Sequence, residues 1–255
     1  LKVFQIPIAS RTSRGKPIVN ILPLEEGERI TSMLPVTEYT NDHYVFMATS
    51  NGTVKKTVLT NFARQRSVGL RAIELDEGDE LVGTAITDGS HDVMLVSTSG
   101  KTIRFKEVDV RPMGRTARGV RGIKMGGEYR MIALIIPQDN RQILTVSENG
   151  YGKRTQVEDF PVYGRGGQGV IGIQTNDRNG GVVGAVQVSD ADEIMLISDK
   201  GTLVRTRVKE VSVQGRNTMG VRLIRLKEGE KLVGLEQVDE PTGEESDLTS
   251  SEEIK

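Results

Sequence analysis

The 255-residue sequence has no cysteine, no tryptophan and only two histidines, His43 and His91. Without cysteine it can form neither a disulfide framework nor a thiolate zinc site, and two isolated histidines exclude a His-rich metal site. No apolar run approaches the ~20 residues of a membrane span, and no segment resembles a secretory signal. The absence of cysteine fits a reducing compartment. Because Leu1 is not a natural start, we expect the chain to be part of a longer protein.

Aromatic residues are also few, at five Phe and five Tyr, so a core must be built from Val, Ile and Leu. The formal net charge of −1 hides a strong asymmetry. Residues 239–255 carry seven acids and one Lys, which leaves residues 1–238 with a net charge of +5. We expect the acidic tail to be disordered, because it has little apolar surface to bury.

A repeat of about 50 residues organises the chain. Four apolar, β-branched runs begin at Val45, Val93, Ile143 and Ile194, and each ends at a turn glycine: Gly52, Gly100, Gly150 or Gly201. A run of this kind followed by glycine predicts a strand and a hairpin turn. Further along each unit comes a second glycine followed by an apolar stretch, at Gly15, Gly69, Gly119, Gly169 and Gly220.

Each unit therefore holds roughly four strands, and no stretch shows sustained helical periodicity. This predicts an all-β, propeller-like fold of four-stranded blades with very little helix. The predicted units are a partial blade at 1–44 that lacks its first strand, full blades at 45–92, 93–142, 143–193 and 194–238, and the tail at 239–255.

Basic residues follow the repeat. One stands four positions after each hairpin glycine, and with its neighbours this set is Lys2, Lys55, Lys56, Arg104, Lys106, Lys153, Arg154, Arg205 and Arg207. A second set flanks the second glycine: Arg11, Arg14, Lys16, Arg64, Arg66, Arg71, Arg115, Arg118, Arg121, Arg165, Arg216 and Arg222. Equivalent positions in a radial array face equivalent directions, so we expect a ring of positive charge around the perimeter. Such a ring suits the phosphates of a bent duplex. The alternative is that these are ordinary solvent-facing residues of strands, which also protect sheet edges from aggregation.

Catalytic patterns are weak. The two histidines lie where repeats join, and paired carboxylates such as Asp76 and Glu77 lie in turns, where acids are expected. The run from Gly164 to Gly169 lacks the Lys-Ser/Thr ending of a P-loop. We therefore expect no catalytic residue, no metal and no cofactor in this chain.

Several runs resemble the C-terminal domain of bacterial DNA gyrase A: Arg14–Glu25, Phe46–Thr57, Asn149–Thr155 and Gly201–Val208. The resemblance covers about residues 1–240. It implies a β-pinwheel whose blades exchange strands and whose perimeter wraps duplex DNA in support of negative supercoiling. It also implies a bacterial cytoplasmic, nucleoid-associated location and an isolated fragment that is monomeric.

For the parent enzyme, the resemblance implies a type II topoisomerase of two A and two B subunits that uses ATP and Mg. Its catalytic tyrosine lies outside this chain, so the fragment is not expected to be an enzyme on its own. The family's first blade carries a box reading Gln-Arg-Arg-Gly-Gly-Lys-Gly, which is absent here. Residues Arg165–Gly169 look like a degenerate echo of it.

Three other functions remain open at this point. The related DNA-binding domain of topoisomerase IV is disfavoured by the gyrase-like runs. A protein-interaction propeller is disfavoured by the net charge and by the repeating Arg and Lys. A propeller enzyme is disfavoured by the lack of a catalytic constellation.

Overall fold

The computed structural model describes residues 1–238 except 11, 23, 25–26, 65 and 67–68. Arg11 and the predicted acidic tail at 239–255 lie outside the described residues. The described part contains fifteen strands and six short 3₁₀ segments, with no α-helix, which confirms the predicted all-β class. No helix in this part of the chain is long and apolar enough to cross a bilayer.

The strands form four antiparallel sheets. The first has the order β3-β1-β2-β6, with β1 at Tyr44–Thr49, β2 at Thr53–Val58, β3 at Leu81–Thr87 and β6 at Val120–Arg121. The second is β10-β5-β4-β7, with β4 at Asp92–Ser97, β5 at Lys101–Lys106, β7 at Met131–Ile135 and β10 at Val170–Ile171. The third is β11-β8-β9-β14, with β8 at Gln142–Ser147, β9 at Tyr151–Gln156, β11 at Val182–Val188 and β14 at Val221–Arg222. The fourth is β13-β12-β15, with β12 at Glu193–Ser198, β13 at Leu203–Arg207 and β15 at Leu232–Val238.

Each of the first three sheets takes its short fourth strand from the next repeat. Strand β6 pairs with β2, β10 with β5, and β14 with β9. The second glycine of each repeat therefore leads into a strand that belongs to the preceding blade. This exchange confirms the pinwheel arrangement that the family resemblance implied.

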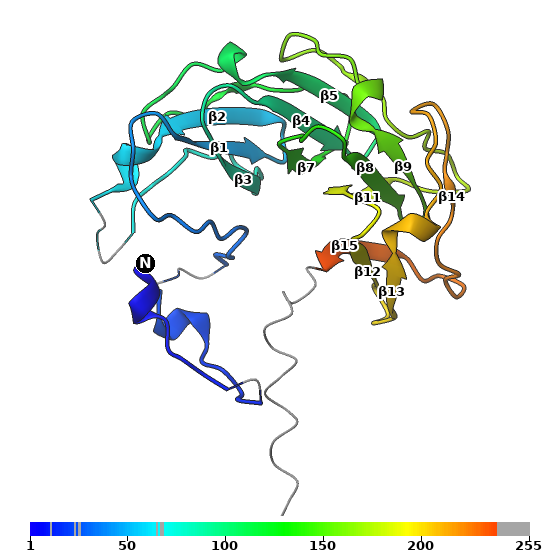
Figure 1. The fold of residues 1–255 in the computed structure, drawn as a ribbon, viewed down its shortest axis with the longest axis horizontal. Helices are drawn as coiled ribbons and strands as arrows, with labels where there is room; N and C mark the ends of the chain where they lie inside the picture. Colours follow the sequence, from blue (N-terminus) through cyan, green and yellow to red (C-terminus); the bar gives the residue numbers. More distant parts are fainter. Residues whose placement is uncertain (11, 23, 25–26, 65, 67–68, 239–255) are drawn as a thin grey trace, which may run out of the picture.

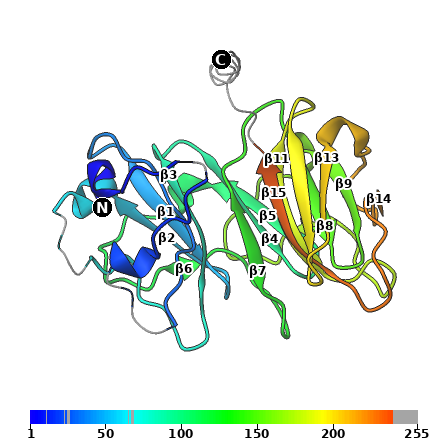
Figure 2. The same cartoon turned by 90° about the horizontal axis from the view of Figure 1, so that it is seen from below.

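The blades stand side by side in an open arc (Figures 1 and 2). Strands β3, β7, β11 and β15 lie on the concave side, and β14 lies on the convex side (Figure 1). The exchanged strands are at the convex end of the strand order in each four-stranded sheet. The convex edge is thus built from segments that link one blade to the next.

The hydrophobic core lies between adjacent blades. In β4, Val93 and Leu95 face the first sheet, while Met94 and Val96 face the third. All four side chains are at most 1% exposed. Successive residues of a strand point to opposite faces of the sheet. A strand covered on both faces therefore buries nearly every side chain, whatever its type.

Short 3₁₀ segments follow the second strand of each hairpin. They are η3 at Leu59–Phe62, η4 at Glu107–Asp109, η5 at Val157–Asp159 and η6 at Val208–Glu210. In the last three, the first residue is fully or almost fully buried. The segments η4 and η5 and the C-terminal end of η6 place backbone carbonyl groups against the preceding blade.

The N-terminal segment contains only two 3₁₀ turns, η1 at Val3–Gln5 and η2 at Ile18–Asn20, and no strand in its described residues. It lies beside the first sheet, where the Thr84 hydroxyl donates to the Ser32 hydroxyl at 2.7 Å. Phe4 and Met33 are about four-fifths exposed, at 80% and 82%. This segment therefore lacks the sheet neighbour that covers such side chains elsewhere in the chain.

Candidate nucleic-acid interface

Three glycines allow the exchanged segments to lie directly on the preceding blade. Gly119, Gly169 and Gly220 all have positive φ, and an added Cβ would lie 2.4–2.5 Å from a backbone oxygen of that blade. Only glycine fits such a close approach at positive φ. The recurring glycine is therefore a packing requirement at these three positions.

The basic residue four positions after the hairpin glycine points into the next repeat. Arg104 Nη1 donates to the carbonyl oxygens of Val157 and Phe160, at 2.9 and 3.3 Å. In the next blade, Arg154 Nε donates to Val211 O at 2.7 Å. Both arginines thus bind the 3₁₀ turn of the following blade.

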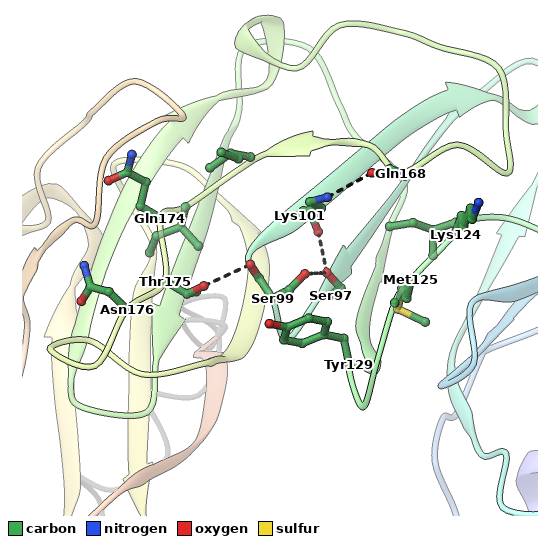
Figure 3. A pocket seen from close by; sticks show the side chains of 14 residues that line it. Ser97, Ser99, Lys101, Lys124, Met125, Tyr129, Gln168, Gln174, Thr175 and Asn176 are labelled. Atoms are coloured by element: carbon green, nitrogen blue, oxygen red, sulfur yellow. Dashed lines mark hydrogen bonds between the residues drawn. The ribbon is translucent and has the colours of Figure 1, made fainter.

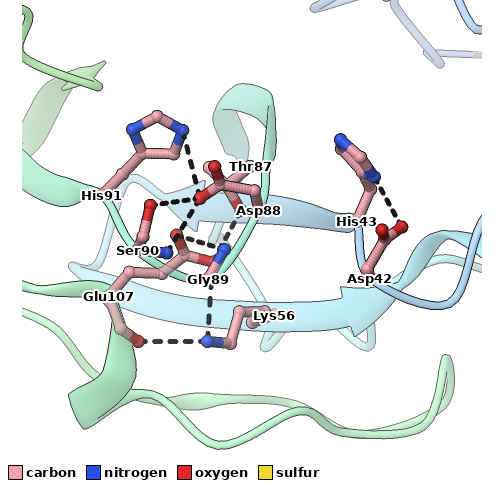
Figure 4. Close-up of polar contacts among 9 residues, drawn as sticks. All are labelled: Asp42, His43, Lys56, Thr87, Asp88, Gly89, Ser90, His91 and Glu107. Carbon is pink, nitrogen blue, oxygen red and sulfur yellow. Dashed lines mark hydrogen bonds and ion pairs between the residues drawn. The ribbon is translucent and has the colours of Figure 1, made fainter.

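Lys56 occupies the same position in the first sheet. Its Nζ donates to Glu107 O at 3.2 Å and lies 3.5 Å from Glu107 Oε1 (Figure 4). The Glu107 carboxylate is fully buried and also accepts hydrogen bonds from Thr87 Oγ1 at 2.6 Å and Gly89 N at 3.1 Å. Lys56 Nζ lies 4.8 Å from the centre of the Tyr44 ring. We call Lys56, Arg104 and Arg154 the inter-blade cations.

The expectation that this recurring position forms an exposed ring is wrong for Lys56 and Arg154, which are 4% and 6% exposed. Arg104 is also mostly covered. In the last unit, Arg205 is exposed and pairs with Glu193 instead. The physical reason is that β2, β5 and β9 are sandwiched between blades, so the charge is satisfied by the neighbour's carbonyl groups.

Lys55 and Lys153 are also buried, both at 0% exposure, and are not part of an outer rim. Lys153 Nζ donates to the carbonyl oxygens of Gly215 and Arg216 at 2.6 and 2.5 Å. Lys55 Nζ donates to the carbonyls of Ala72 and Arg115. Burial, together with the nearby charges of Arg115 and Arg216, lowers the pKa of both lysines to about 8. The two lysines thus bind the backbone of the loops that carry Arg115 and Arg216 in the next repeat.

Other predicted cations are exposed but already paired with carboxylates: Lys106, Arg118, Arg205 and Arg207. Lys106 and Arg104 share Asp92, at 2.6 and 2.7 Å. Arg118 contacts Glu74 and Asp76, at 3.4 and 2.7 Å. Arg205 and Arg207 share Glu193. Their charges are partly neutralised within the chain.

Four predicted arginines on the exchanged segments have no carboxylate partner among the described residues: Arg121, Arg165, Arg216 and Arg222. Arg165 Nη1 donates to Arg121 O at 3.2 Å, and Arg216 Nη1 makes the equivalent bond to Ile171 O at 3.0 Å. Arg165 and Arg216 lie in the loops that precede β10 and β14, so each bond joins one of these loops to the exchanged strand of the preceding repeat unit. We call these four residues the outer arginine seam.

The remaining predicted cations do not join this seam. Those at the N-terminal end of the array are exposed: Lys2, Arg14, Lys16, Arg64, Arg66 and Arg71. Arg115 is half-buried above Lys55. The structure thus separates the predicted group of cations into buried, paired, N-terminal and seam positions, with Arg11 undescribed.

A groove of about 710 Å³ is lined by segments of the second and third repeats (Figure 3). Its lining includes Lys101, whose Nζ donates to Gln168 Oε1 at 3.3 Å, and Lys124. Ser97 and Ser99 share a hydrogen bond at 2.8 Å, but no histidine or carboxylate among the described residues lines the groove. Neither serine therefore has a histidine or carboxylate base beside it in the groove.

The histidines show no catalytic or metal-binding arrangement in the described part of the chain. His43 and His91 each lie next to one aspartate, Asp42 and Asp88, at the surface (Figure 4). Hydrogen bonds from Thr40 and from Ser90 lower the pKa of these two carboxyl groups. No group of three metal-ligating side chains occurs among the described residues.

Sequence reasoning missed four basic residues that line the inter-blade grooves: Lys101, Lys124, Arg178 and Arg225. A stricter alignment of the repeats would have found two of them, because Lys124 and Arg225 follow the equivalent residues Ile123 and Ile224. Lys101 and Arg178 have no basic equivalent in the other repeats, so no periodic signal marks them.

The chain matches a family model described as "DNA gyrase C-terminal domain, beta-propeller" over residues 1–37, 43–88, 91–137, 141–189 and 192–239. The DNA gyrase A protein of Salmonella typhimurium is 59% identical over 96% of this chain. The same protein of Pseudomonas aeruginosa is 51% identical over 99% of it. The chain spans only 28% and 32% of these two relatives.

Two solved structures share the fold. The C-terminal domain of a DNA topoisomerase IV superposes with a TM-score of 0.83 at 25% identity, over 88% of this chain and 71% of that one. A DNA gyrase A C-terminal domain superposes with a TM-score of 0.77 at 28% identity, over 88% of this chain and 75% of that one.

Proposed function

This chain belongs to the DNA gyrase C-terminal domain family, and we propose that it binds and bends duplex DNA along the outer arginine seam. The observation that carries the proposal is the seam itself. Four guanidinium groups, two on the exchanged strands β6 and β14 and two in the loops before β10 and β14, lack carboxylate partners among the described residues on the convex edge of the arc. Duplex DNA presents one negative charge per ~1.7 Å, and arginine binds phosphate without needing to read the bases.

The arc also suits bending. Bending a short duplex by 40–90° costs on the order of 1–6 kcal/mol. A hydrogen bond to a charged group contributes roughly 1.5–3 kcal/mol, so a few seam contacts offset that cost. A rigid convex edge supplies these contacts only to DNA that follows its curvature.

Within the family, this activity would serve DNA gyrase. We propose that the chain wraps DNA for a type II topoisomerase of two A and two B subunits, which supplies catalysis and ATP use. The names of the two relatives described above, both DNA gyrase A proteins, support this assignment. The bacterial cytoplasm is the location that follows from it.

The alternative is DNA binding with little wrapping, which we associate with the topoisomerase IV likeness. A topology assay separates the two. Relaxed plasmid is incubated with the chain and a nicking–closing enzyme, and the topoisomers are then resolved. A shift in linking number supports wrapping, whereas affinity without a shift supports simple bending.

Binding itself is tested with Arg121→Gln across a salt series. The Arg121 side chain makes no hydrogen bond to another described residue, so its loss changes charge more than structure. We expect weaker binding and a log–log salt slope smaller by about 1 than that of the wild-type chain. The control is Arg141→Gln, because Arg141 is ion-paired with Asp192 at 3.5 Å. Equal salt slopes for both variants and the wild type would show that Arg121 of the seam does not contact the DNA.

A further inference from the structure

Two arginines converge on one buried tyrosine in a groove lined by residues of the third and fourth repeats. Tyr151 is 4% exposed, and its hydroxyl oxygen accepts hydrogen bonds from Arg178 Nε at 3.0 Å and Arg222 Nη2 at 2.9 Å. Both guanidinium carbons lie 5.3 Å from the centre of the Tyr151 ring. These hydrogen bonds lower the pKa of the Tyr151 hydroxyl.

The position of Arg178 is fixed by its loop. Asn179 is fully buried, and its Nδ2 donates to Gln174 O at 2.7 Å and to Met219 O at 3.5 Å. Asn149 Nδ2 donates to Arg178 O at 3.1 Å. The loop is therefore tied both to its own repeat and to the following one.

Arg222 reaches the same point from the other side of the groove. It lies in β14, directly opposite Tyr151 of β9 in the register of the exchanged strand. Strand exchange thus brings guanidinium groups from two different repeats onto one phenolic oxygen. Only the third hairpin can do this, because the residue after the glycine is Thr53, Lys101 or Thr202 in the other hairpins.

The charges at this point are not neutralised within the described chain. The groove has a volume of about 620 Å³, and Arg225 also lines it, but no carboxylate of a described residue does. No ion pair joins Arg178, Arg222 or Arg225 to an acid among the described residues. Two cations that share a neutral oxygen repel each other, and an oxyanion between them would relieve this repulsion.

We propose that Arg178, Arg222 and Tyr151 form an oxyanion site that takes one backbone phosphate of the DNA. Guanidinium groups bind phosphate oxygens through paired N–H donors. The tyrosine hydroxyl can turn to donate its own proton to a phosphate oxygen. This site deepens the proposed function and rests on it, since Arg222 belongs to the outer arginine seam.

The test measures duplex DNA affinity for the full chain carrying Arg178→Gln, Arg222→Gln or both, with Arg141→Gln as the charge-matched control. We expect each single variant to bind roughly tenfold more weakly than the control at low salt. Because both residues hold the same phosphate, the double variant should lose less than the product of the two single losses. Unfolding midpoints measured in parallel show whether each variant keeps the fold.

Two outcomes would overturn the site while leaving the proposed function intact: Arg178→Gln binding like Arg141→Gln, or fully multiplicative losses in the double variant. If the wild-type chain itself fails to bind DNA at low salt, the proposed function fails. The site is then judged with inorganic pyrophosphate. A shift of the Arg178 Nε resonance, assigned by its loss in Arg178→Gln, upholds an oxyanion site, and an unchanged spectrum overturns it.

Discussion

Replacing Lys56 by Met tests the idea that the inter-blade cations stabilise the array. Lys56 Nζ lies 3.5 Å from Glu107 Oε1, and both side chains are almost completely buried, at 5% and 0% exposure. At an effective dielectric constant of about 20, the attraction across that distance is roughly 5 kcal/mol. Methionine keeps the apolar stem but leaves the Glu107 charge buried without its cation.

We therefore expect Lys56→Met to lower the free energy of unfolding by about 3–5 kcal/mol, the usual loss when one partner of a buried pair is removed. The matched control is Lys106→Met. Lys106 is 56% exposed in its 2.6 Å pair with Asp92, so its replacement should cost only about 0–1 kcal/mol.

The second half of the test is a double-mutant cycle with Glu107→Gln, measured by urea unfolding. Glutamine keeps an oxygen acceptor for the Thr87 hydroxyl while removing the charge. The variant that carries both changes should be much more stable than the sum of the single losses predicts, because neither charge is left alone. Additive losses, or a loss below about 1 kcal/mol for Lys56→Met, would refute the inter-blade role.

Two further predictions concern the same junctions. Gly169→Ala places a Cβ 2.4 Å from Thr102 O at positive φ, so its thermal unfolding midpoint should fall, whereas Gly164→Ala in the same loop meets nothing within 4 Å and should not change it. Between about pH 8 and 10.5 the folded chain has lost the Lys153 proton that the unfolded chain still keeps, so stability should rise with pH in this window. Urea midpoints at about pH 7.5 and 9.5 check this, and the rise should be smaller in Lys153→Met. An equal rise in that variant would contradict the buried-lysine assignment.

The repeat was readable from the sequence because turn glycines and β-branched runs mark hairpins by local chemistry. The hairpins predicted to turn at Gly52, Gly100, Gly150 and Gly201 are all present. The direction of the side chains was not readable in the same way. In β2, Lys55 and Lys56 are neighbours that point to opposite faces, yet both are buried. Alternation distinguishes a core face from a solvent face only when one face is exposed.

Recurrence of a basic residue was also ambiguous. Recurrence indicates that the basic side chain has the same surroundings in each repeat. Those surroundings can be a neighbouring blade as well as a bound ligand. Arg104 and Arg154 recur because each following 3₁₀ turn presents carbonyl oxygens to them. Arg165 and Arg216 recur on the convex edge, where their bonds leave much of each guanidinium available. Burial separates these two cases, and burial depends on contacts between repeats that no single repeat encodes.

Hydrogen bonds to the backbone link buried cations to the exposed arginines of the seam. Lys153 holds the carbonyl oxygens of Gly215 and Arg216, so a buried ammonium fixes the backbone from which a seam arginine projects. The same blade uses Arg154 to bind the next 3₁₀ turn. A convex edge that bends DNA must be stiffer than the duplex, since otherwise the protein arc would deform and the DNA would stay straight. Under the proposed function, the cations buried between blades would contribute to DNA bending indirectly, by holding together the blades that carry the outer arginine seam.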